Sequence, residues 1–214
     1  FISTVDSGNF VGYLYVVKEF LEENKNKTDL EYLKKLVDEL INNTDFSKLY
    51  SEKNKLMSIG FNLEENKLVD SYYDFLASEA RQASIIAIAK GDIPVKHWNN
   101  LSRTLTSLNG YKGLVSWTGT AFEYLMPNVN LERYKGSLLD EASAFAIMSQ
   151  IEYCKKMSVP WGISESAFDV RDLNNNYQYK AFGIPWLGLK RGLDEDIVVS
   201  PYSTFLSLED ELEN

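Results

Sequence analysis

Hydrophobic residues recur every three or four positions along several stretches of the chain, which is the spacing of one face of an α-helix. The longest apolar stretch, residues 72–90, is closed by Gly91, and its composition predicts a helix that is buried nearly all round. The order Thr-Asp-Leu-Glu at residues 28–31 predicts a capping box. We expect helices over residues 10–23 (capped by Ser7 or Asn9), 30–40, 72–90, a short stretch from Pro94, 118–125, 139–157 and 202–208.

Signals for strands are brief. Residues 56–62 and 114–117 fit short strands, and residues 158–201 are predicted to be mostly irregular because Pro and Gly interrupt them repeatedly. The sequence therefore predicts a mainly α architecture with short β elements and long loops. Loops on a rigid scaffold are where binding and catalytic residues concentrate.

Composition narrows the class of protein. The chain has 214 residues, of which 44% are hydrophobic and 25% charged, as in ordinary globular proteins. Its formal net charge of -9 argues against nucleic acid as a partner, because phosphate binding needs clustered Lys and Arg. We find no signal peptide and no apolar run of roughly 20 residues. Because the chain opens at Phe1, we expect it to be a piece of something longer.

His97 and Cys154 are the only histidine and the only cysteine. They cannot make an ordinary zinc site, and a lone cysteine cannot form an internal disulfide. We interpret Cys154 as a buried thiol, and we give little weight to a Ser-His-Asp triad built on His97. No metal and no organic cofactor is expected.

The stretch from Trp161 to Gly183 combines aromatic rings, amides and carboxylates. Flat rings stack on pyranose faces, amides and Arg hold hydroxyls, and carboxylates supply acid–base chemistry. This mixture indicates a sugar site rather than a core.

Glu79 is the first candidate for chemistry. It lies inside the predicted helix of residues 72–90, where burial raises the pKa of a carboxyl group, as a general acid requires at neutral pH. The alternative is a structural ion pair with Arg81 or another cation, and the residues alone do not favour either interpretation.

Glu165 is the second candidate. It lies between Ser164 and Ser166, and we expect these hydroxyls and solvent to keep it ionised, which suits a nucleophile or base. On spacing alone, a surface glutamate or a helix cap is the favoured alternative.

Asp6 and Glu123 are weaker candidates. Asp6 stands before a predicted helix, so it is either a capping residue or a carboxylate directed into a cleft. Glu123 shares a helical face with Thr120 and Met126, so we expect it to line the wall of a site. Of the aromatic residues near these carboxylates, we expect most to be core or wall residues and a few to stack on sugars.

Long motifs of unusual composition then identify a family resemblance. They include Ser71-Tyr72-Tyr73-Asp74 and Pro160-Trp161-Gly162-Ile163-Ser164-Glu165-Ser166, together with residues 1–9, 77–81, 88–92, 116–120, 122–127 and 176–183. Across nearly its whole length the chain resembles the glucoamylase-like domain of bacterial cyclic β-1,2-glucan synthases.

The resemblance implies an (α/α)6 toroid, of which residues 1–214 would be a single partial domain carrying about half of the helices. It implies a β-1,2-glucan substrate whose ends are joined by retaining transglycosylation. The family's two catalytic glutamates fall on Glu79, as acid/base, and Glu165, as nucleophile. We place the following residues as substrate-binding: Asp6, Asn9, Tyr72, Tyr73, Arg81, Trp117, Glu123, Trp161, Ser166, Tyr177 and Tyr179.

Two other functions stay open. One is an inverting endo-β-1,2-glucanase, and the other is a non-catalytic carbohydrate-binding or scaffold module. The expected partners are β-1,2-glucan and other domains of a larger parent protein, which could associate with a membrane although nothing in this chain inserts into one. Exposed apolar helix surfaces would also favour self-association.

Overall fold

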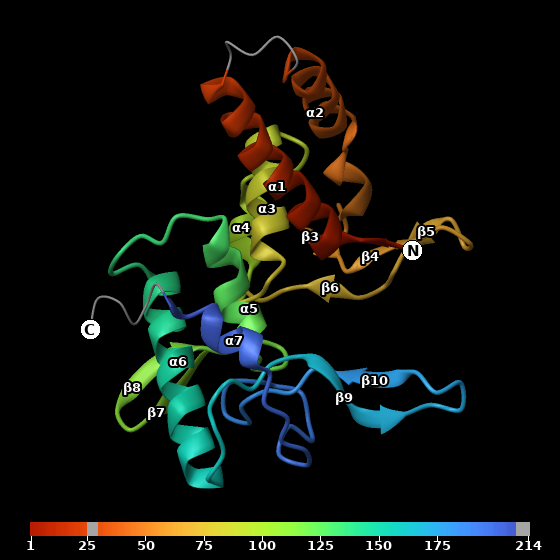
Figure 1. Cartoon of the computed structure of the whole chain (residues 1–214). Helices are drawn as coiled ribbons and strands as arrows, with labels where there is room; N and C mark the ends of the chain where they lie inside the picture. The colour runs from red at the N-terminus through yellow and green to blue at the C-terminus, as the bar shows by residue number, and fades with distance from the viewer. Residues whose placement is uncertain (25–29, 209–214) are drawn as a thin grey trace. The chain divides into compact units, whose positions relative to one another are not determined.

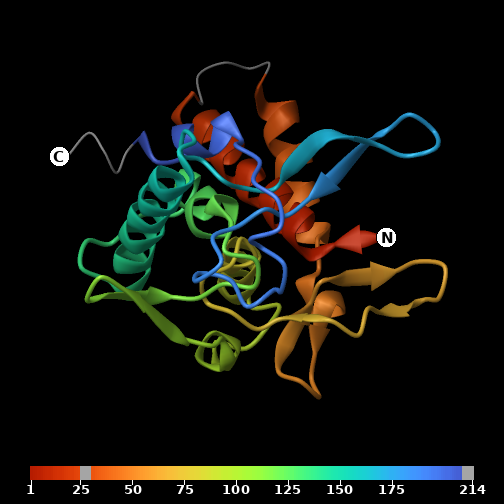
Figure 2. The same cartoon turned by 90° about the horizontal axis from the view of Figure 1, so that it is seen from below.

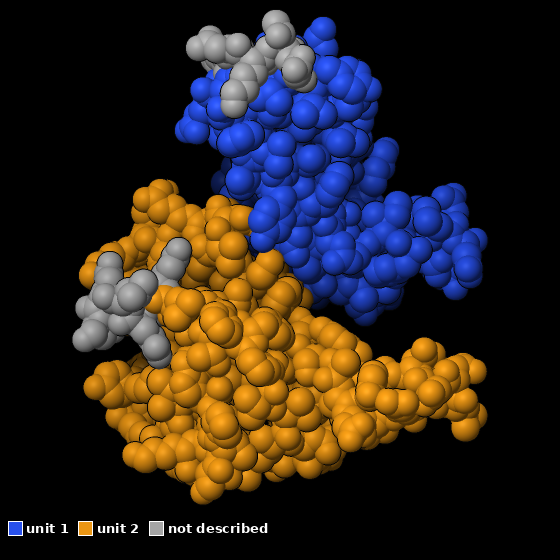
Figure 3. All heavy atoms as spheres, in the orientation of Figure 1, with its two compact units in different colours: residues 1–74, 80–101 blue, residues 75–79, 102–214 orange. Residues whose placement is uncertain are grey.

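Helices make up more of the chain than strands do in the computed structural model, which describes residues 1–24 and 30–208 (Figure 1). The described residues divide into two compact units (Figure 3). Unit 1 comprises residues 1–24, 30–74 and 80–101, and unit 2 comprises residues 75–79 and 102–208. The mainly α architecture with short β elements is therefore confirmed, whereas a half toroid remains a prediction.

Unit 1 is built on a long first helix. Its helices are α1 (Thr4–Glu23), α2 (Glu31–Asn43), α3 (Arg81–Lys90) and α4 (Lys96–Asn100), with a 3-10 turn, η2 (Phe46–Leu49). Helix α1 packs against both α2 and α3 (Figure 1). Val11, Phe46, Met57 and Ala87 are fully buried in the core between these elements and the neighbouring strands.

Six short strands complete unit 1 in two antiparallel sheets. One sheet has the order β1 (Ile2–Ser3), β4 (Gly60–Asn62), β5 (Lys67–Leu68), and the other β2 (Tyr50–Ser51), β3 (Leu56–Ser58), β6 (Tyr72–Tyr73). The strands predicted within residues 56–62 are thus present as β3 and β4.

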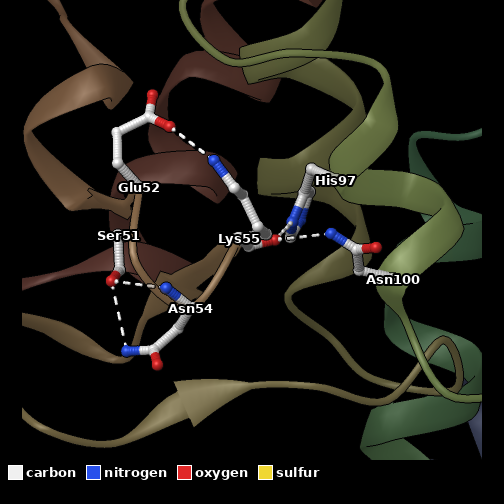
Figure 4. A network of polar contacts seen from close by, with 6 residues as sticks. All are labelled: Ser51, Glu52, Asn54, Lys55, His97 and Asn100. Atoms are coloured by element: carbon white, nitrogen blue, oxygen red, sulfur yellow. Dashed lines mark hydrogen bonds and ion pairs between the residues drawn. The ribbon is translucent and has the colours of Figure 1, made fainter.

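His97 has a structural place in unit 1 (Figure 4). Its ring is fully buried, with Nε2 2.9 Å from Ser84 Oγ and Nδ1 3.3 Å from the Lys55 carbonyl oxygen. The Asn100 amide donates to the same carbonyl, so α4 holds the β2–β3 turn, where Lys55 has a φ of 59°. Burial lowers the pKa of His97, so the ring stays neutral at neutral pH.

Unit 2 contains a second long helix. Its helices are α5 (Ala121–Leu125), α6 (Leu138–Met157) and α7 (Pro201–Phe205), with a 3-10 turn, η3 (Met126–Val129). Two hairpins belong to it, β7 (Leu105–Leu108) with β8 (Tyr111–Leu114), and β9 (Ser166–Arg171) with β10 (Tyr177–Lys180). The β9–β10 hairpin projects from the rest of its unit as an arm (Figure 2). Cys154 is buried on α6, as predicted, and burial raises the pKa of its thiol.

Several predicted elements are wrong in their bounds. The strand expected over residues 114–117 is displaced, because β8 pairs with β7 over Tyr111–Leu114 and ends where the predicted strand begins. The helix expected over residues 72–90 forms only from Arg81, because β6 pairs with β3 and Leu76 N donates to Ser102 O at 3.1 Å. The first helix starts at Thr4 because the Ser3 hydroxyl caps it by accepting from Asp6 N, so neither Ser7 nor Asn9 is the cap. Residues 158–201, predicted to be mostly irregular, contain the β9–β10 hairpin. The predicted capping-box residues Thr28 and Asp29 lie outside the described residues.

Candidate active site

Glu79 ends the segment Phe75–Glu79 of unit 2 and lies in a turn rather than on a helix. The segment is attached by a bridge between Phe75 and Ser102, and the Ser78 hydroxyl donates to Glu79 Oε2 at 3.3 Å. The carboxyl group is mostly shielded from solvent, and this burial is the main reason that its pKa is raised to about 8. The negative charges of Glu123 and Glu165 contribute to the same rise, while hydrogen bonds from its own backbone N–H and from Ser78 act in the opposite direction.

Glu165 directly precedes strand β9, and the residues before it are fixed from three helices. Ile163 exchanges two hydrogen bonds of 2.7 Å with the amide of Gln150 on α6. Phe122 N, on α5, donates to Ser164 Oγ at 3.1 Å, and Tyr202, on α7, reaches both Ser164 Oγ and the Glu165 carbonyl oxygen. The backbone of Glu165 is therefore held on a rigid support.

The environment of the Glu165 carboxyl group differs from the expectation. Burial raises its pKa, and the charge of Glu123 adds to this, whereas a hydrogen bond from the Tyr179 hydroxyl lowers it. The neighbouring serines do not serve the carboxylate, because Ser166 Oγ donates to the Ala167 carbonyl oxygen and Ser164 Oγ accepts from Phe122 N. Shielding from solvent therefore has the largest effect on the pKa of Glu165.

The Glu123 carboxylate holds together the loop of residues 116–120, which precedes α5. Its side chain is only 6% exposed and accepts hydrogen bonds from Ser116 Oγ (2.7 Å), Trp117 N (3.2 Å), Thr118 N (3.1 Å) and Thr120 N and Oγ1 (3.0 and 3.3 Å). Thr120 Oγ1 in turn accepts from Glu123 N, which completes a capping box at the start of α5. This set of donors suits a carboxylate anion, and its fixed charge acts on both Glu79 and Glu165.

Tyr179 joins the carboxylates from the hairpin. Antiparallel pairing places Tyr179 opposite Ala167 and Lys180 opposite Ser166, which brings β10 beside the residue that follows Glu165. Partial shielding of the hydroxyl group raises the pKa of Tyr179 most, followed by the negative charge of Glu165 and the hydrogen bond to it, and the charge of Glu79 adds a smaller increase. Its phenol therefore acts as a hydrogen-bond donor to Glu165 at neutral pH.

Unit 2 thus brings Glu79, Glu123, Glu165 and Tyr179 within electrostatic reach of one another. Trp117, Trp161 and Tyr177 of this unit were also predicted to belong to the site. The Trp117 ring is 57% exposed beside the Glu123 loop.

Trp161 and Tyr177 have partners of their own. The carbonyl oxygen of Trp161 accepts from Thr204 Oγ1 at 3.3 Å. The hydroxyl of Tyr177 accepts from Arg171 at 2.6 Å, and the guanidinium lies over the ring of the same tyrosine. Whether these two rings bind sugar stays a prediction.

Five predicted site residues belong to unit 1. Asp6 and Asn9 lie on α1, with Asp6 exposed in the first turn, while Tyr72 and Tyr73 form β6 and Arg81 is buried at the start of α3. Their convergence with the carboxylates of unit 2 stays a prediction.

Sequence reasoning missed two supporting hydroxyl groups, those of Ser78 and Tyr202. Ser78 could have been found from its position next to Glu79. Tyr202 gives no local signal, because it reaches the Glu165 carbonyl oxygen across 37 residues of sequence.

Among the described residues, no group of three or more His, Cys, Asp or Glu side chains is arranged to hold a metal ion. In the same part of the chain, no helix is both long enough and apolar enough to cross a bilayer.

A family model named Glycoamylase and described as "Putative glucoamylase" matches residues 71–213, which is more than half of the chain. The chain belongs to this glucoamylase-like family. The resemblance noted from the sequence motifs is thereby confirmed, and the match includes Glu79, Glu123, Glu165 and Tyr202.

Two known proteins are similar to this glucoamylase-like chain. It is 44% identical over 163 residues to the cyclic beta-(1,2)-glucan synthase NdvB of Rhizobium meliloti (strain 1021), a match that covers 76% of this chain and 6% of the synthase. Its fold is similar to that of an endo-beta-1,2-glucanase from Chitinophaga pinensis, solved with sophorotriose and glucose, with a TM-score of 0.72 and 16% identity.

The structural match covers 99% of this chain and 53% of the glucanase. This glucoamylase-like chain therefore spans about half the length of the glucanase and a small part of the synthase. At 16% identity, the likeness to the glucanase shows the fold alone.

Proposed function

We propose that this chain forms part of a domain that cleaves and transfers β-1,2-glucan, with Glu79 as the acid/base and Glu165 as the nucleophile. The observation that carries the proposal is the grouping of carboxyl groups in unit 2, one of which has its pKa raised to about 8. The names of the two relatives support the substrate class, since one is a cyclic β-1,2-glucan synthase and the other an endo-β-1,2-glucanase.

In the first step, Glu79 donates its proton to the glycosidic oxygen. A pKa of about 8 keeps this carboxyl group protonated at neutral pH, so the proton is available when the leaving group departs. Glu165 attacks the anomeric carbon and forms a glycosyl ester. The hydrogen bond from Tyr179 favours the ionised form of Glu165 that this attack needs.

In the second step, Glu79 must act as a base. The charge of Glu165 contributes to the raised pKa of Glu79, and that charge disappears when Glu165 becomes an ester. The pKa of Glu79 therefore falls in the intermediate, which suits it to take a proton from the incoming sugar hydroxyl or water. The same pair of groups thus serves both steps.

An inverting endo-β-1,2-glucanase uses the same acid but a different second step. There, a carboxylate activates a water molecule directly, and the two carboxyl groups stand about 6.5–9.5 Å apart instead of about 5–5.5 Å. The buried charge of Glu165 beside Glu79 fits either geometry.

The deciding experiment is product analysis with the full polypeptide that carries this chain and linear β-1,2-glucan. Cyclic products support transfer, and linear reducing oligosaccharides support hydrolysis. The anomeric configuration of newly released reducing ends, followed by NMR in the first minutes, separates retention from inversion. If the glucan binds in calorimetry but its chain length never changes, the domain is a binding module and the catalytic proposal is wrong.

A further inference from the structure

The hydroxyl group of Tyr202 meets the polypeptide at the residue proposed as nucleophile. Tyr202 lies in the first turn of α7, and its Oη is 2.8 Å from Ser164 Oγ and 3.0 Å from the Glu165 carbonyl oxygen. The contact with Glu165 is to its backbone carbonyl oxygen, so it affects the position of the residue rather than the charge of its carboxyl group.

The protons of this group can be assigned in one continuous chain. Phe122 N–H can only donate, and it donates to Ser164 Oγ at 3.1 Å, while the Glu165 carbonyl oxygen can only accept. The hydroxyl groups of Ser164 and Tyr202 each have one proton to donate. All three contacts are satisfied when Ser164 donates to Tyr202 and Tyr202 donates to Glu165 O. The chain then connects α5 and α7 through the residues that carry Glu165.

The same segment is fixed on its other side. Gln150 holds both backbone groups of Ile163 at 2.7 Å, and Ser200 N donates to Gly162 O at 2.7 Å. Tyr202 is the group that continues this support to Glu165 itself. With Tyr202 removed, the backbone carbonyl of Glu165 would lose the hydrogen bond it receives from α7.

We propose that Tyr202 is a positioning residue that fixes the backbone of Glu165 for nucleophilic attack, an inference that rests on the proposed function. The tyrosine itself is 39% exposed and is not one of the buried core residues. Its hydroxyl should therefore matter more for the reaction than for stability. A displacement of about 1 Å in a reacting group can cost on the order of 100-fold in rate.

The test uses Tyr202→Phe, Ser164→Ala and the double variant in the full polypeptide, with kcat, KM and melting temperature measured for each. The matched control is Tyr124→Phe, which removes another hydroxyl of unit 2 that donates to a backbone carbonyl, Leu114 O, at 2.9 Å. We expect Tyr202→Phe to lower kcat about 10- to 100-fold with KM within about twofold of wild type. Tyr124→Phe should lower the melting temperature and leave kcat within about twofold.

If the hydroxyls act as one chain, the double variant is no slower than the slower single variant. A Tyr202→Phe enzyme with wild-type kcat, or one that loses rate only together with folded protein as the control does, overturns the positioning role. The proposed function fails separately, if wild-type protein does not turn over β-1,2-glucan or if Glu79→Gln leaves turnover intact.

Discussion

At the scale of single residues, the carboxyl group of Glu79 keeps its proton at neutral pH because burial and two neighbouring negative charges all disfavour its anion. Glu123 supplies one of these charges from a loop whose donors hold it in place. Glu165 supplies the other and is itself under opposing influences, since burial raises its pKa and Tyr179 lowers it. The chemistry therefore depends on three carboxyl groups with different surroundings.

The raised pKa of Glu79 makes stability depend on pH. The folded state holds this proton up to a pH of about 8, whereas an ordinary glutamate releases it near 4.5. Between these values the folded state binds more protons, so stability is full below about 4.5 and falls as the pH rises through 8. Glu79→Gln, which cannot ionise, should be stabilised relative to wild type by on the order of 4 kcal/mol at pH 9 compared with pH 5.

Thermal unfolding at pH 5, 7 and 9 measures this effect, with Glu141→Gln at an exposed position of α6 as the control. The control should follow wild type at every pH. If Glu79→Gln also follows wild type, Glu79 is not the shielded acid described here.

Tyr179→Phe tests the opposing influence on Glu165. Removing the phenol removes the hydrogen bond that lowers the pKa of Glu165, so that pKa should rise. A hydrogen bond to a charged group contributes about 1.5–3 kcal/mol, and because Tyr179 is 65% exposed we expect the lower end, on the order of one pH unit. The acidic limb of the pH–rate profile should move to higher pH.

Tyr177→Phe is the matched control for this shift. It lies on the same strand, but its hydroxyl accepts from Arg171 instead of serving Glu165. Whatever this variant does to the rate, its acidic limb should stay in place. An unmoved limb in Tyr179→Phe would contradict the role of the hydrogen bond.

The sequence led to Glu79 and Glu165 through long motifs, but it described their surroundings incompletely. The shielding of Glu79 was expected from a helix, yet it arises in a turn beside two other carboxylates. Glu123 was expected to line a wall, and the structure shows that its carboxylate holds a loop. Tyr202 could not be found at all, since its partners are distant in sequence.

At the scale of elements, a close approach between α1 and α3 organises unit 1. A Cβ added to Gly8 would lie 2.7 Å from Ala83 Cα and 3.0 Å from Ala83 N, which are backbone atoms that cannot move aside. One turn further along α1, a Cβ added to Gly12 would meet Gln82 Nε2, the end of a flexible side chain. Both glycines face α3, but an added methyl group would meet backbone atoms at Gly8 and a side chain at Gly12.

Gly8→Ala should therefore lower the free energy of unfolding by about 1–3 kcal/mol through overpacking, despite the better helix propensity of alanine. Gly12→Ala is the control, and we expect it to lose less stability than Gly8→Ala, because its added methyl group would meet the end of the Gln82 side chain and not backbone atoms. Denaturant titration compares the two variants. Equal effects, or a stable Gly8→Ala, would show that α1 and α3 do not pack as described.

Local patterns predicted helices best where the helix supplies its own hydrogen bonds. Residues 139–157 were predicted as a helix, and α6 spans Leu138–Met157. Residues 72–80 have the same apolar character, but their backbone groups pair with β3 and Ser102, which local periodicity does not reveal. The β9–β10 hairpin was missed for the same reason, since pairing across a turn at Asp172–Asn176 defines it.

At the scale of the whole molecule, unit 1 presents apolar side chains to solvent along its first two helices. On α1 these are Phe10, Tyr13, Val16, Val17 and Phe20, each at least 43% exposed and spaced to share one face. On α2 the exposed residues are Tyr32, Leu33, Leu36 and Leu40. An exposed apolar surface of this kind favours association with another protein surface.

We expect this 214-residue chain, produced by itself, to self-associate through the α1 face. Light scattering should give a mass above 24.5 kDa. The double change Val16→Lys and Phe20→Lys should reduce that mass, whereas Glu19→Gln with Glu23→Gln, which alters the net charge equally on the same helix, should not. A wild-type chain that remains a monodisperse monomer would contradict this expectation.

The most direct test of the catalytic account is the rate at which the full polypeptide shortens or cyclises linear β-1,2-glucan in wild type, Glu79→Gln and Glu165→Gln, with Glu141→Gln as the control. The account predicts turnover by wild type and control, and a loss of on the order of 100-fold or more in both of the other variants. Turnover that survives either substitution at the wild-type rate would contradict it.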